Sequence, residues 1–300
     1  MIQRASRRAS IVYILAFYSV IFLISIFVGH AEPPQLRSPI DTKTIAPGMT
    51  EYIFKIDADG DNPEFQLIIA EAKLSAVTLR LLGGSGRLGE GEFNFPTELS
   101  DLNQKGAGVL ISGAYSQRVG SAFLPLGYLK SDGKVISDHI HHTWIVDTMF
   151  CVGSKPGQVS FAPALSANTS AYPSCFQTGP RIFLEGVPII QKLQNNTAIP
   201  NKETALTGRQ NYMDTPYVRL FICMNREAAP NIIRFGISTE KVTVWRMLEI
   251  LPSLAIGDKA ACQDVVDLGG NTSAGMVING DLVAGSDSFL LTSALALVPK

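Results

Sequence analysis

Short apolar segments, separated by turns rich in glycine, proline and asparagine, recur along the chain after residue 50. Such segments predict strands, and the turn Asp59–Pro63 separates the first two of them. The predicted strands are 51–56, 65–70, 76–82, 109–111, 135–136, 144–146, 159–161, 218–224, 232–237, 264–268, 275–278 and 290–298.

One segment has the spacing of a helical face instead. Within residues 242–251, Val244, Leu248 and Leu251 fall on one side of a helix, and Thr243 stands near its start. Residues 191–211 are polar and irregular, which predicts a long loop. With few helices, no repeat and no internal change of composition, the pattern predicts a single α+β domain over residues 51–300. We expect a mixed β-sheet with few flanking helices.

The N-terminus has the order of a secretory signal peptide. Arg4, Arg7 and Arg8 precede an apolar run over residues 11–28, and the small residues Gly29 and Ala31 follow it. The run also nearly spans a bilayer, so an uncleaved signal anchor is the alternative. In both interpretations the rest of the chain is exported to the periplasm or the extracellular space. Only an uncleaved N-terminal segment would anchor the protein to a membrane. Residues 1–31 are therefore predicted as leader and residues 32–50, rich in Pro, Thr and Ser, as linker.

Composition and charge narrow the class of protein. Hydrophobic residues make up 46% and charged residues 17% of the chain, which argues against long disordered tracts. Without the three leader arginines, 22 basic residues face 26 acidic ones, a net charge of −4. Because a nucleic-acid backbone requires a basic face, we expect no nucleic-acid partner.

The cysteines Cys151, Cys175, Cys223 and Cys262 all lie in the part predicted to be exported. An even number in an oxidising compartment indicates disulfides, and four cysteines allow three pairings. The shortest loops favour Cys151–Cys175 and Cys223–Cys262, while buried free thiols are the alternative.

Candidate catalytic and metal chemistry is sparse when judged from spacing alone. No Ser-His-Asp or Cys-His set can be assembled, and no nucleophile elbow is present. His139 and His141 would share a face if they stood on a strand, as two metal ligands could, but a strand end that happens to hold histidines is commoner. No cofactor is evident and no metal ligand set is assigned, although a divalent metal is not excluded.

Four stretches, in this order, resemble motifs of the phosphodiester glycosidase family, whose best-known activity removes a capping N-acetylglucosamine from mannose 6-phosphate. The first, Val109–Ser116, is similar to the family's strand ending in Asn-Gly-Gly-Tyr/Phe-Phe, and it continues into Pro125–Lys134, similar to Pro-x-Gly-Leu-x-x-x-x-Gly-Lys. The second, Gln177–Gly186, is similar to Gln-x-Gly-Pro-x-Leu-x-x-x-Gly. The third is the strand with Arg219, the strand after it and the predicted helix. The fourth, Cys262–Ser273, is similar to Ala-Leu-Asn-Leu-Asp-Gly-Gly-Gly-Ser.

The chain departs from this pattern at three motif positions. Ser112 stands where the family has Asn, Ala114 where it has the second Gly, and Gly269 where it has Asp. Asp267 lies two positions earlier, on the same face of a strand, and could partly substitute for the acid. The residues that remain in pattern are Gly113, Tyr115, Gly127, Gln177, Gly179, Pro180, Arg219, Gly270 and Ser273.

The resemblance implies a site for an anionic sugar. Cleaving a sugar from a phosphodiester builds positive charge at the anomeric carbon, which carboxylates stabilise, while a guanidinium suits the phosphate. In this interpretation Arg219 grips the phosphate, Gln177 contacts sugar or phosphate and Asp267 supplies the carboxylate. Substrate-binding positions would be Gly113, Tyr115, Gly179, Gly270 and Ser273. The expected function is an exported hydrolase acting on a sugar-phosphate diester of envelope or extracellular glycan. The alternative is an inactive glycan-binding module in polysaccharide export or attachment.

Overall fold

The computed structural model describes residues 36–83, 97–102, 106–120, 122–141, 143–155, 157–189, 212–224, 232–257, 259–269 and 273–300. They belong to a compact unit that spans Leu36–Lys300. The predicted leader, the predicted loop at residues 191–211 and Gly270 lie outside the described residues. No helix within the described ranges is long and apolar enough to span a membrane.

The largest sheet has eight strands, all in antiparallel pairs, in the order β1-β2-β3-β16-β15-β19-β13-β14. Its strands are β1 (Asp41–Ala46), β2 (Met49–Ile56), β3 (Phe65–Lys73), β13 (Arg181–Leu184), β14 (Val187–Pro188), β15 (Tyr217–Met224), β16 (Ile232–Val242) and β19 (Asp264–Gly269). The sheet begins at Asp41, inside the stretch predicted as linker.

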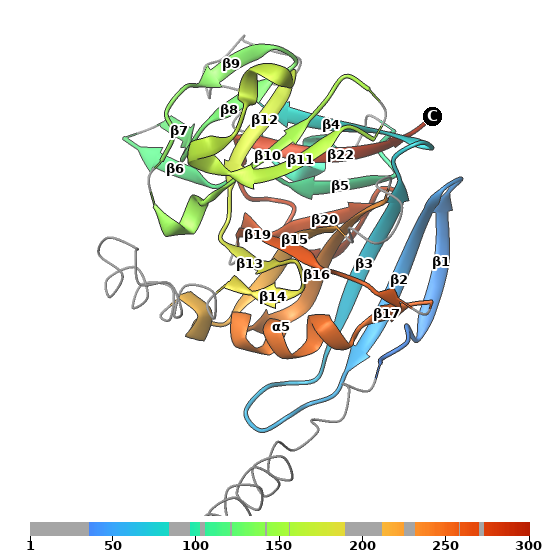
Figure 1. The fold of residues 1–300 in the computed structure, drawn as a ribbon. Helices are drawn as coiled ribbons and strands as arrows, with labels where there is room; N and C mark the ends of the chain where they lie inside the picture. The colour runs from blue at the N-terminus through green and yellow to red at the C-terminus, as the bar shows by residue number, and fades with distance from the viewer. Residues whose placement is uncertain are drawn as a thin grey trace, which may run out of the picture. The chain divides into compact units, whose positions relative to one another are not determined.

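Two further sheets of five antiparallel strands complete the architecture (Figure 1). One has the order β21 (Asp281–Gly285), β20 (Gly275–Ile278), β5 (Val109–Ser112), β22 (Ser293–Pro299) and β4 (Val77–Gly83). The other has the order β11 (Val159–Pro163), β10 (Thr148–Val152), β12 (Ser174–Thr178), β8 (Leu129–Ser131) and β9 (Lys134–Ser137). Two small ribbons pair β6 (Ser116–Val119) with β7 (Ala122–Pro125), and β17 (Ala255–Ile256) with β18 (Lys259–Ala260).

Helical structure is limited to short segments in the described part of the chain. The α-helices with defined ends are α2 (Leu99–Leu102) and α5 (Val244–Ile250), and the 3-10 turns are η2 (Trp144–Val146), η3 (Ala164–Ser166), η4 (Thr169–Ala171) and η5 (Leu251–Ser253). The helix predicted at 242–251 is present in shortened form, and the Thr243 hydroxyl caps it by accepting a hydrogen bond from the Arg246 N–H at 3.1 Å.

The predicted α+β class is wrong, because antiparallel sheets form most of the described fold and no long helix packs against them. The expectation overestimated the helical contribution, since the one helical face in the sequence extends over only two turns. The strand predicted at residues 144–146 is also wrong, since these residues form the turn η2. The chain is largely a β protein.

The eight-stranded sheet is buried on both faces, as the alternation along β3 shows. Leu67 and Ile69 pack into a cluster with Val244 and Met247 of α5, whereas Ile68 and Ala70 pack into a cluster with residues of β4, β5 and β22. Alternating side chains of one strand thus serve two cores. The strands β15 and β19, which carry Arg219 and Asp267, lie next to each other within this sheet.

Candidate functional site

Arg219 of β15 and Asp267 of β19 meet inside the protein. Leu220 pairs with Gly269 and Phe221 with Asp267, so Leu268 is an extra residue that forms a β-bulge. A bulge bends its strand and redirects side chains. Here the Arg219 Nη1 lies 3.2 Å from Asp267 Oδ2, and each side chain is only 1% exposed.

The Arg219 guanidinium is held on several sides. Its Nε donates to the Val242 carbonyl at 3.0 Å, and its Nη2 donates to the carbonyls of Tyr212 and Thr215. The centre of the guanidinium lies 4.7 Å from the Tyr212 ring centroid and 5.1 Å from that of Tyr217. The Arg219 nitrogens already donate to acceptors within the protein, and the side chain is buried. Both observations favour a positioning role for Arg219 over direct phosphate binding.

Asp267 accepts several hydrogen bonds. Tyr212 donates its hydroxyl to Oδ2 at 2.8 Å, and the Gly269 N–H donates to Oδ1 at 3.0 Å. Burial raises the pKa of Asp267 above its ordinary value, although Arg219 and these hydrogen bonds act in the opposite direction. Burial thus destabilises the charged form of Asp267 by more than Arg219 and the hydrogen bonds stabilise it.

Tyr115, which follows β5, adds a further hydroxyl to this network. Its hydroxyl lies 3.1 Å from that of Tyr212, and since Tyr212 gives its proton to Asp267, Tyr115 is the donor between the two. Burial, followed by the negative charge of Asp267, raises the pKa of both phenols, which therefore stay protonated. We call Tyr115, Tyr212, Arg219 and Asp267 the tyrosine–arginine cluster; its two tyrosines are partly exposed and its two charges are buried.

Gly269 stands where the resemblance places an aspartate, and a side chain at this position would be strained and tightly packed. Its φ is 118°, and a Cβ there would lie 3.2 Å from the Tyr115 ring. The Tyr115 ring thus occupies the space next to Gly269, and Asp267 reaches the Tyr115 hydroxyl through that of Tyr212.

Gly113 and Ser112 serve packing rather than the tyrosine–arginine cluster. A Cβ on Gly113 would lie 2.5 Å from the Ser293 Oγ, and the Gly113 N–H donates to the Ser293 carbonyl at 2.9 Å. The Ser112 hydroxyl accepts from the Gly275 N–H at 3.2 Å. Ser273 lies just before β20 and is partly exposed.

Gln177 of β12 uses both ends of its amide to hold neighbouring backbone. Its Nε2 donates to the carbonyls of His141 and Val146 at 2.7 Å each, and its Oε1 accepts from the N–H groups of His141 and Tyr128. The side chain is 1% exposed. Such a fully engaged amide positions the chain before Asp147, and the structure does not bring it into contact with Arg219.

Asp147 is a carboxylate that the sequence analysis did not single out. It follows η2, lies partly exposed, and its Oδ1 accepts hydrogen bonds from the Arg181 N–H at 3.0 Å and the Thr148 hydroxyl at 2.9 Å. Gly179 lies against it, because a Cβ there would come within 2.9 Å of Oδ1. No motif marks an acid at the end of an irregular loop, and its contact with Gly179 and Arg181 comes from tertiary structure rather than from sequence spacing.

The two disulfides confirm the pairing favoured by loop length. Cys151 and Cys175 face each other on β10 and β12, and Cys223 on β15 bonds to Cys262 before β19. No free cysteine remains among the described residues. The first bond joins two neighbouring strands, and the second joins β15 to the segment just before β19, so both restrict the unfolded chain and stabilise the fold.

A metal site is not formed by the described histidines and acids. The rings of His139 and His141 pack edge to face with centroids 5.1 Å apart, in a loop rather than on a strand. Across the described ranges, no group of three His, Cys, Asp or Glu side chains has the arrangement to hold a metal ion.

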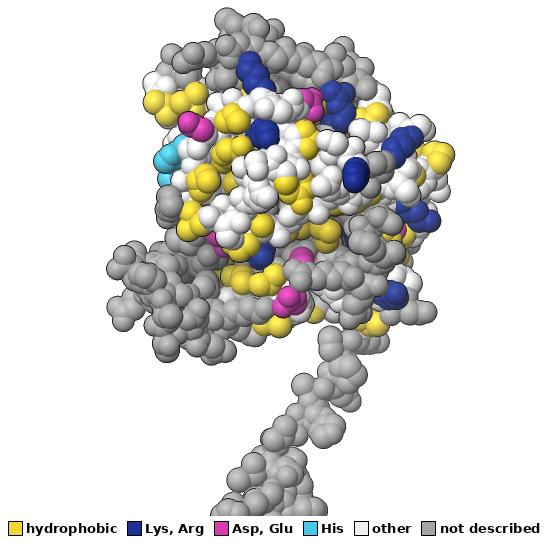
Figure 2. All heavy atoms as spheres, turned by 45° about the horizontal axis from the view of Figure 1, so that its top comes forward, with side chains coloured by type: hydrophobic (Ala, Val, Ile, Leu, Met, Phe, Trp, Pro, Cys, Tyr) yellow, Lys and Arg dark blue, Asp and Glu magenta, His cyan; other side chains and the backbone are white. Residues whose placement is uncertain are grey.

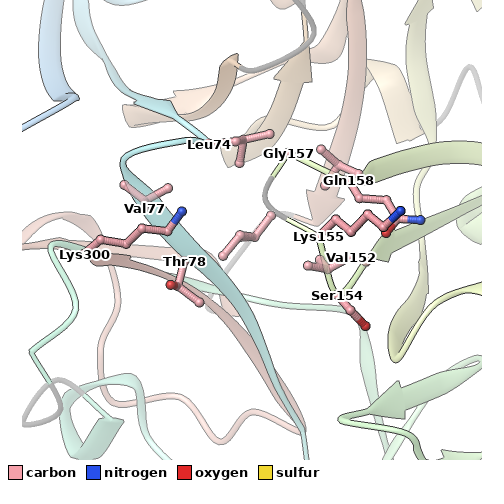
Figure 3. A pocket seen from close by; sticks show the side chains of 12 residues that line it. Leu74, Val77, Thr78, Val152, Ser154, Lys155, Gly157, Gln158 and Lys300 are labelled. Carbon is pink, nitrogen blue, oxygen red and sulfur yellow. The ribbon is translucent and has the colours of Figure 1, made fainter.

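A pocket of about 130 Å³ lies away from the cluster, between the start of β4, the turn after β10 and Lys300. Figure 3 shows the side chains of Lys155 and Lys300 reaching it from different segments, with Val77 and Val152 among its walls. None of the predicted site residues lines it. On the face drawn in Figure 2, lysines and arginines are spread in small groups among apolar side chains.

Comparison with known proteins finds similarity of fold. No protein-family model matches the sequence, and the search of curated proteins finds no relative. Among solved structures, the catalytic domain of zebrafish N-acetylglucosamine-1-phosphodiester alpha-N-acetylglucosaminidase, auto-inhibited by its pro-peptide, superposes with a TM-score of 0.63. It has 15% identity over 87% of this chain and 88% of that one.

Two bacterial structures show the same fold. A hypothetical protein from Synechocystis has a TM-score of 0.63, with 12% identity over 87% of this chain and 64% of its own. A putative exported protein from Burkholderia pseudomallei has a TM-score of 0.52, with 12% identity over 79% of this chain and 74% of its own. The chain thus has the fold of a glycosidase catalytic domain, and its disulfides are compatible with an extracytoplasmic location.

Proposed function

We propose that the chain is an exported hydrolase that cleaves a sugar-phosphate diester in envelope or extracellular glycan. One observation carries the proposal: Tyr115, Arg219 and Asp267, from three of the four motif-like segments, join one hydrogen-bonded cluster. The zebrafish neighbour, whose name describes cleavage of an N-acetylglucosamine-1-phosphodiester, shares the fold around it. In this proposal residues 1–31 direct export, and the domain that contains the eight-stranded sheet, with β1 from Asp41, carries the activity.

The partly exposed tyrosines form the substrate-facing part of the cluster. An aromatic ring with a polar hydroxyl suits a sugar, which has both apolar faces and hydroxyl groups. Arg219 and Asp267 lie beneath and fix the direction of the two phenol protons. Gly113, Gly179, Gly270 and Ser273 belong to the proposed substrate-binding segments, and Gln177 holds the loop before Asp147.

A glycan-binding module without turnover is the second candidate. The observation that favours it is the mutual neutralisation of Arg219 and Asp267, which are each 1% exposed. A buried, paired carboxylate cannot reach an anomeric carbon unless the site opens. The same tyrosines would then bind a sugar phosphate and release it unchanged.

The full chain, produced in an oxidising compartment and purified, should release N-acetylglucosamine from an N-acetylglucosamine-1-phosphodiester. Tyr115→Phe removes the donor at the end of the network and should lower kcat/KM about tenfold, the equivalent of ~1.4 kcal/mol. Tyr172→Phe, at the end of η4, is the matched control and should leave turnover unchanged. Binding without product would select the module, and neither binding nor turnover would reject both functions.

A further inference from the structure

The pocket between the start of β4, the turn after β10 and Lys300 is a second candidate for ligand binding (Figure 3). None of the described residues that line it belongs to the tyrosine–arginine cluster. Its volume is about 130 Å³, and a protein cavity of about 150 Å³ with apolar walls holds a benzene molecule. The pocket therefore has room for one compact group of about the size of a six-membered ring.

The walls of this pocket are apolar and firmly packed. Leu74, Val77, Leu79 and Val152 line it, and their exposed fractions are 3%, 2%, 9% and 8%. All four belong to one core cluster, and Val159, which also lines the pocket, packs against that cluster. Because core packing holds these side chains in place, the hollow is preformed and little ordering is needed when a ligand enters.

Two lysines supply positive charge at the rim. Lys300 donates its Nζ to the Ser75 carbonyl at 2.9 Å and its backbone N–H to the Ala76 carbonyl at 3.1 Å. An ammonium group has three donors, so two remain for a ligand. Lys155 reaches the pocket from the turn after β10 (Figure 3). Among the lining residues that the structure describes none is acidic, so the rim is cationic.

The turn that carries Lys155 has a fixed backbone. The Gly153 N–H donates to the Gln158 carbonyl at 2.7 Å, and the Gln158 N–H donates to the Lys155 carbonyl at 3.1 Å. Just before the turn, the disulfide between Cys151 and Cys175 joins β10 to β12. Both positive charges thus stand on segments whose backbone hydrogen bonds hold them next to the hollow.

Shape and charge together define the class of ligand. Apolar walls favour a group without hydrogen-bonding atoms, because a buried polar group without a partner is unfavourable. Two ammonium groups favour an oxyanion, which accepts charge-assisted hydrogen bonds. A neutral ring or an inorganic anion would satisfy only one half of the pocket.

We propose that this pocket binds a compact organic anion, with an apolar, ring-sized group in the hollow and one carboxylate or phosphate group against Lys155 and Lys300. The class includes aromatic and alicyclic carboxylates and phosphate monoesters of similar size. Binding at this site breaks no bond, and the inference is independent of the proposed hydrolase.

Isothermal titration calorimetry of the full-length protein with benzoate, phenyl phosphate, benzyl alcohol and inorganic phosphate tests the site. Benzoate or phenyl phosphate should bind one to one and at least about tenfold more tightly than benzyl alcohol, which lacks the charge, and inorganic phosphate, which lacks the ring. The tighter of the two organic anions identifies carboxylate or phosphate as the preferred group. Added salt should weaken the binding, because both lysines are exposed.

Variants of the rim locate the bound anion. Lys155→Gln/Lys300→Gln removes both charges and should weaken binding of the preferred anion about tenfold, since each exposed ion pair contributes modestly. Lys259→Gln, exposed on β18 and outside the pocket lining, is the matched control and should bind as wild type does. Thr78→Trp, at an exposed lining position of β4, should obstruct the pocket, and it replaces the double variant if that variant has a changed thermal midpoint.

Three results would overturn the inference. The first is that neither organic anion binds at concentrations up to ~10 mM. The second is that benzyl alcohol or inorganic phosphate binds as tightly as the organic anions. The third is that the folded double variant, or Thr78→Trp in its place, keeps the wild-type affinity, which would put the anion elsewhere on the protein.

Discussion

Two arginines on neighbouring strands of the eight-stranded sheet each meet a carboxylate inside the protein, yet their surroundings differ. Arg234 of β16 faces Glu71 of β3 in register, and Glu71 Oε2 accepts from both Nε at 2.8 Å and Nη2 at 2.7 Å. Arg219 reaches Asp267 through one nitrogen, at 3.2 Å, across a bulge and under tyrosine rings.

The difference shows how one type of contact can serve two purposes. The Arg234 pair joins adjacent strands, and its Nη1 donates to the Ala261 carbonyl next to the Cys223–Cys262 disulfide, which suits a sheet-stabilising role. The Arg219 pair connects through Asp267 to the hydroxyls of Tyr212 and Tyr115. A buried ion pair thus becomes a functional candidate when its hydrogen bonds join side chains from several motif-like segments.

Loss of either arginine should produce the largest effect. Arg219→Ala leaves the buried Asp267 carboxylate without its arginine, and Arg234→Ala does the same to the mostly buried Glu71, so each should lower the free energy of unfolding by about 3–5 kcal/mol. Urea denaturation followed by circular dichroism measures this. A loss below about 1 kcal/mol for either variant would mean that its carboxylate is neutral or solvated when the arginine is gone.

The pH dependence of stability should separate the pairs. Because burial raises the pKa of Asp267, the folded protein holds this proton more tightly than the unfolded chain does. The stabilisation is complete below the ordinary pKa of about 3.8 and is lost as pH rises through the folded pKa, at about 1.4 kcal/mol per unit of difference. Asp267→Asn should abolish this slope in a urea series across acidic pH, while Glu71→Gln should retain it. Equal slopes in both variants would contradict the assignment.

Tyr115 should give the smallest effect. Tyr115→Phe removes a hydrogen bond to Tyr212 and should cost about 0.5–1.5 kcal/mol at neutral pH. Above the ordinary phenol pKa of 10.0, the unfolded chain releases its proton first, so wild-type stability should fall as pH rises further. The variant should lose less stability over that range. An identical alkaline slope would indicate that the folded phenol ionises as freely as the unfolded one.

Much of the strand content could be predicted from the sequence because apolar runs flanked by turn residues are local signals. The runs at 51–56, 218–224 and 232–237 all lie in strands, and the capped helix after Thr243 is where the spacing placed it. The class was missed because the ribbon of β6 and β7 and the short strands β13 and β14 carry no apolar alternation. Trp144–Val146 has a strand-like composition, but Asp147 and the Gln177 amide hold the loop around it in a turn.

The site was only partly predictable, for a related physical reason. Motif similarity indicated Tyr115, Arg219 and Asp267, which the structure joins in one hydrogen-bonded cluster. It also indicated Gln177, whose amide serves the backbone, because a motif does not tell which partner a polar side chain finds. Tyr212 lies in a short helical segment and Asp147 at the end of a 3-10 turn, so their places near Arg219, Asp267 and Arg181 depend on tertiary contacts that no spacing encodes.

The position of β22 between β4 and β5 has a consequence for how this protein acquires its structure. Leu295 pairs with Leu81 on one side and with Ile111 on the other. The five-stranded sheet therefore cannot form between β4 and β5 until β22 has paired with both. Pairings across such sequence distances form slowly, since a long loop must close before any contact rewards it. Until β22 pairs, the apolar edges of β4 and β5 therefore stay exposed in folding intermediates. Chaperones that shield these edges should increase the fraction of the protein that reaches the native state.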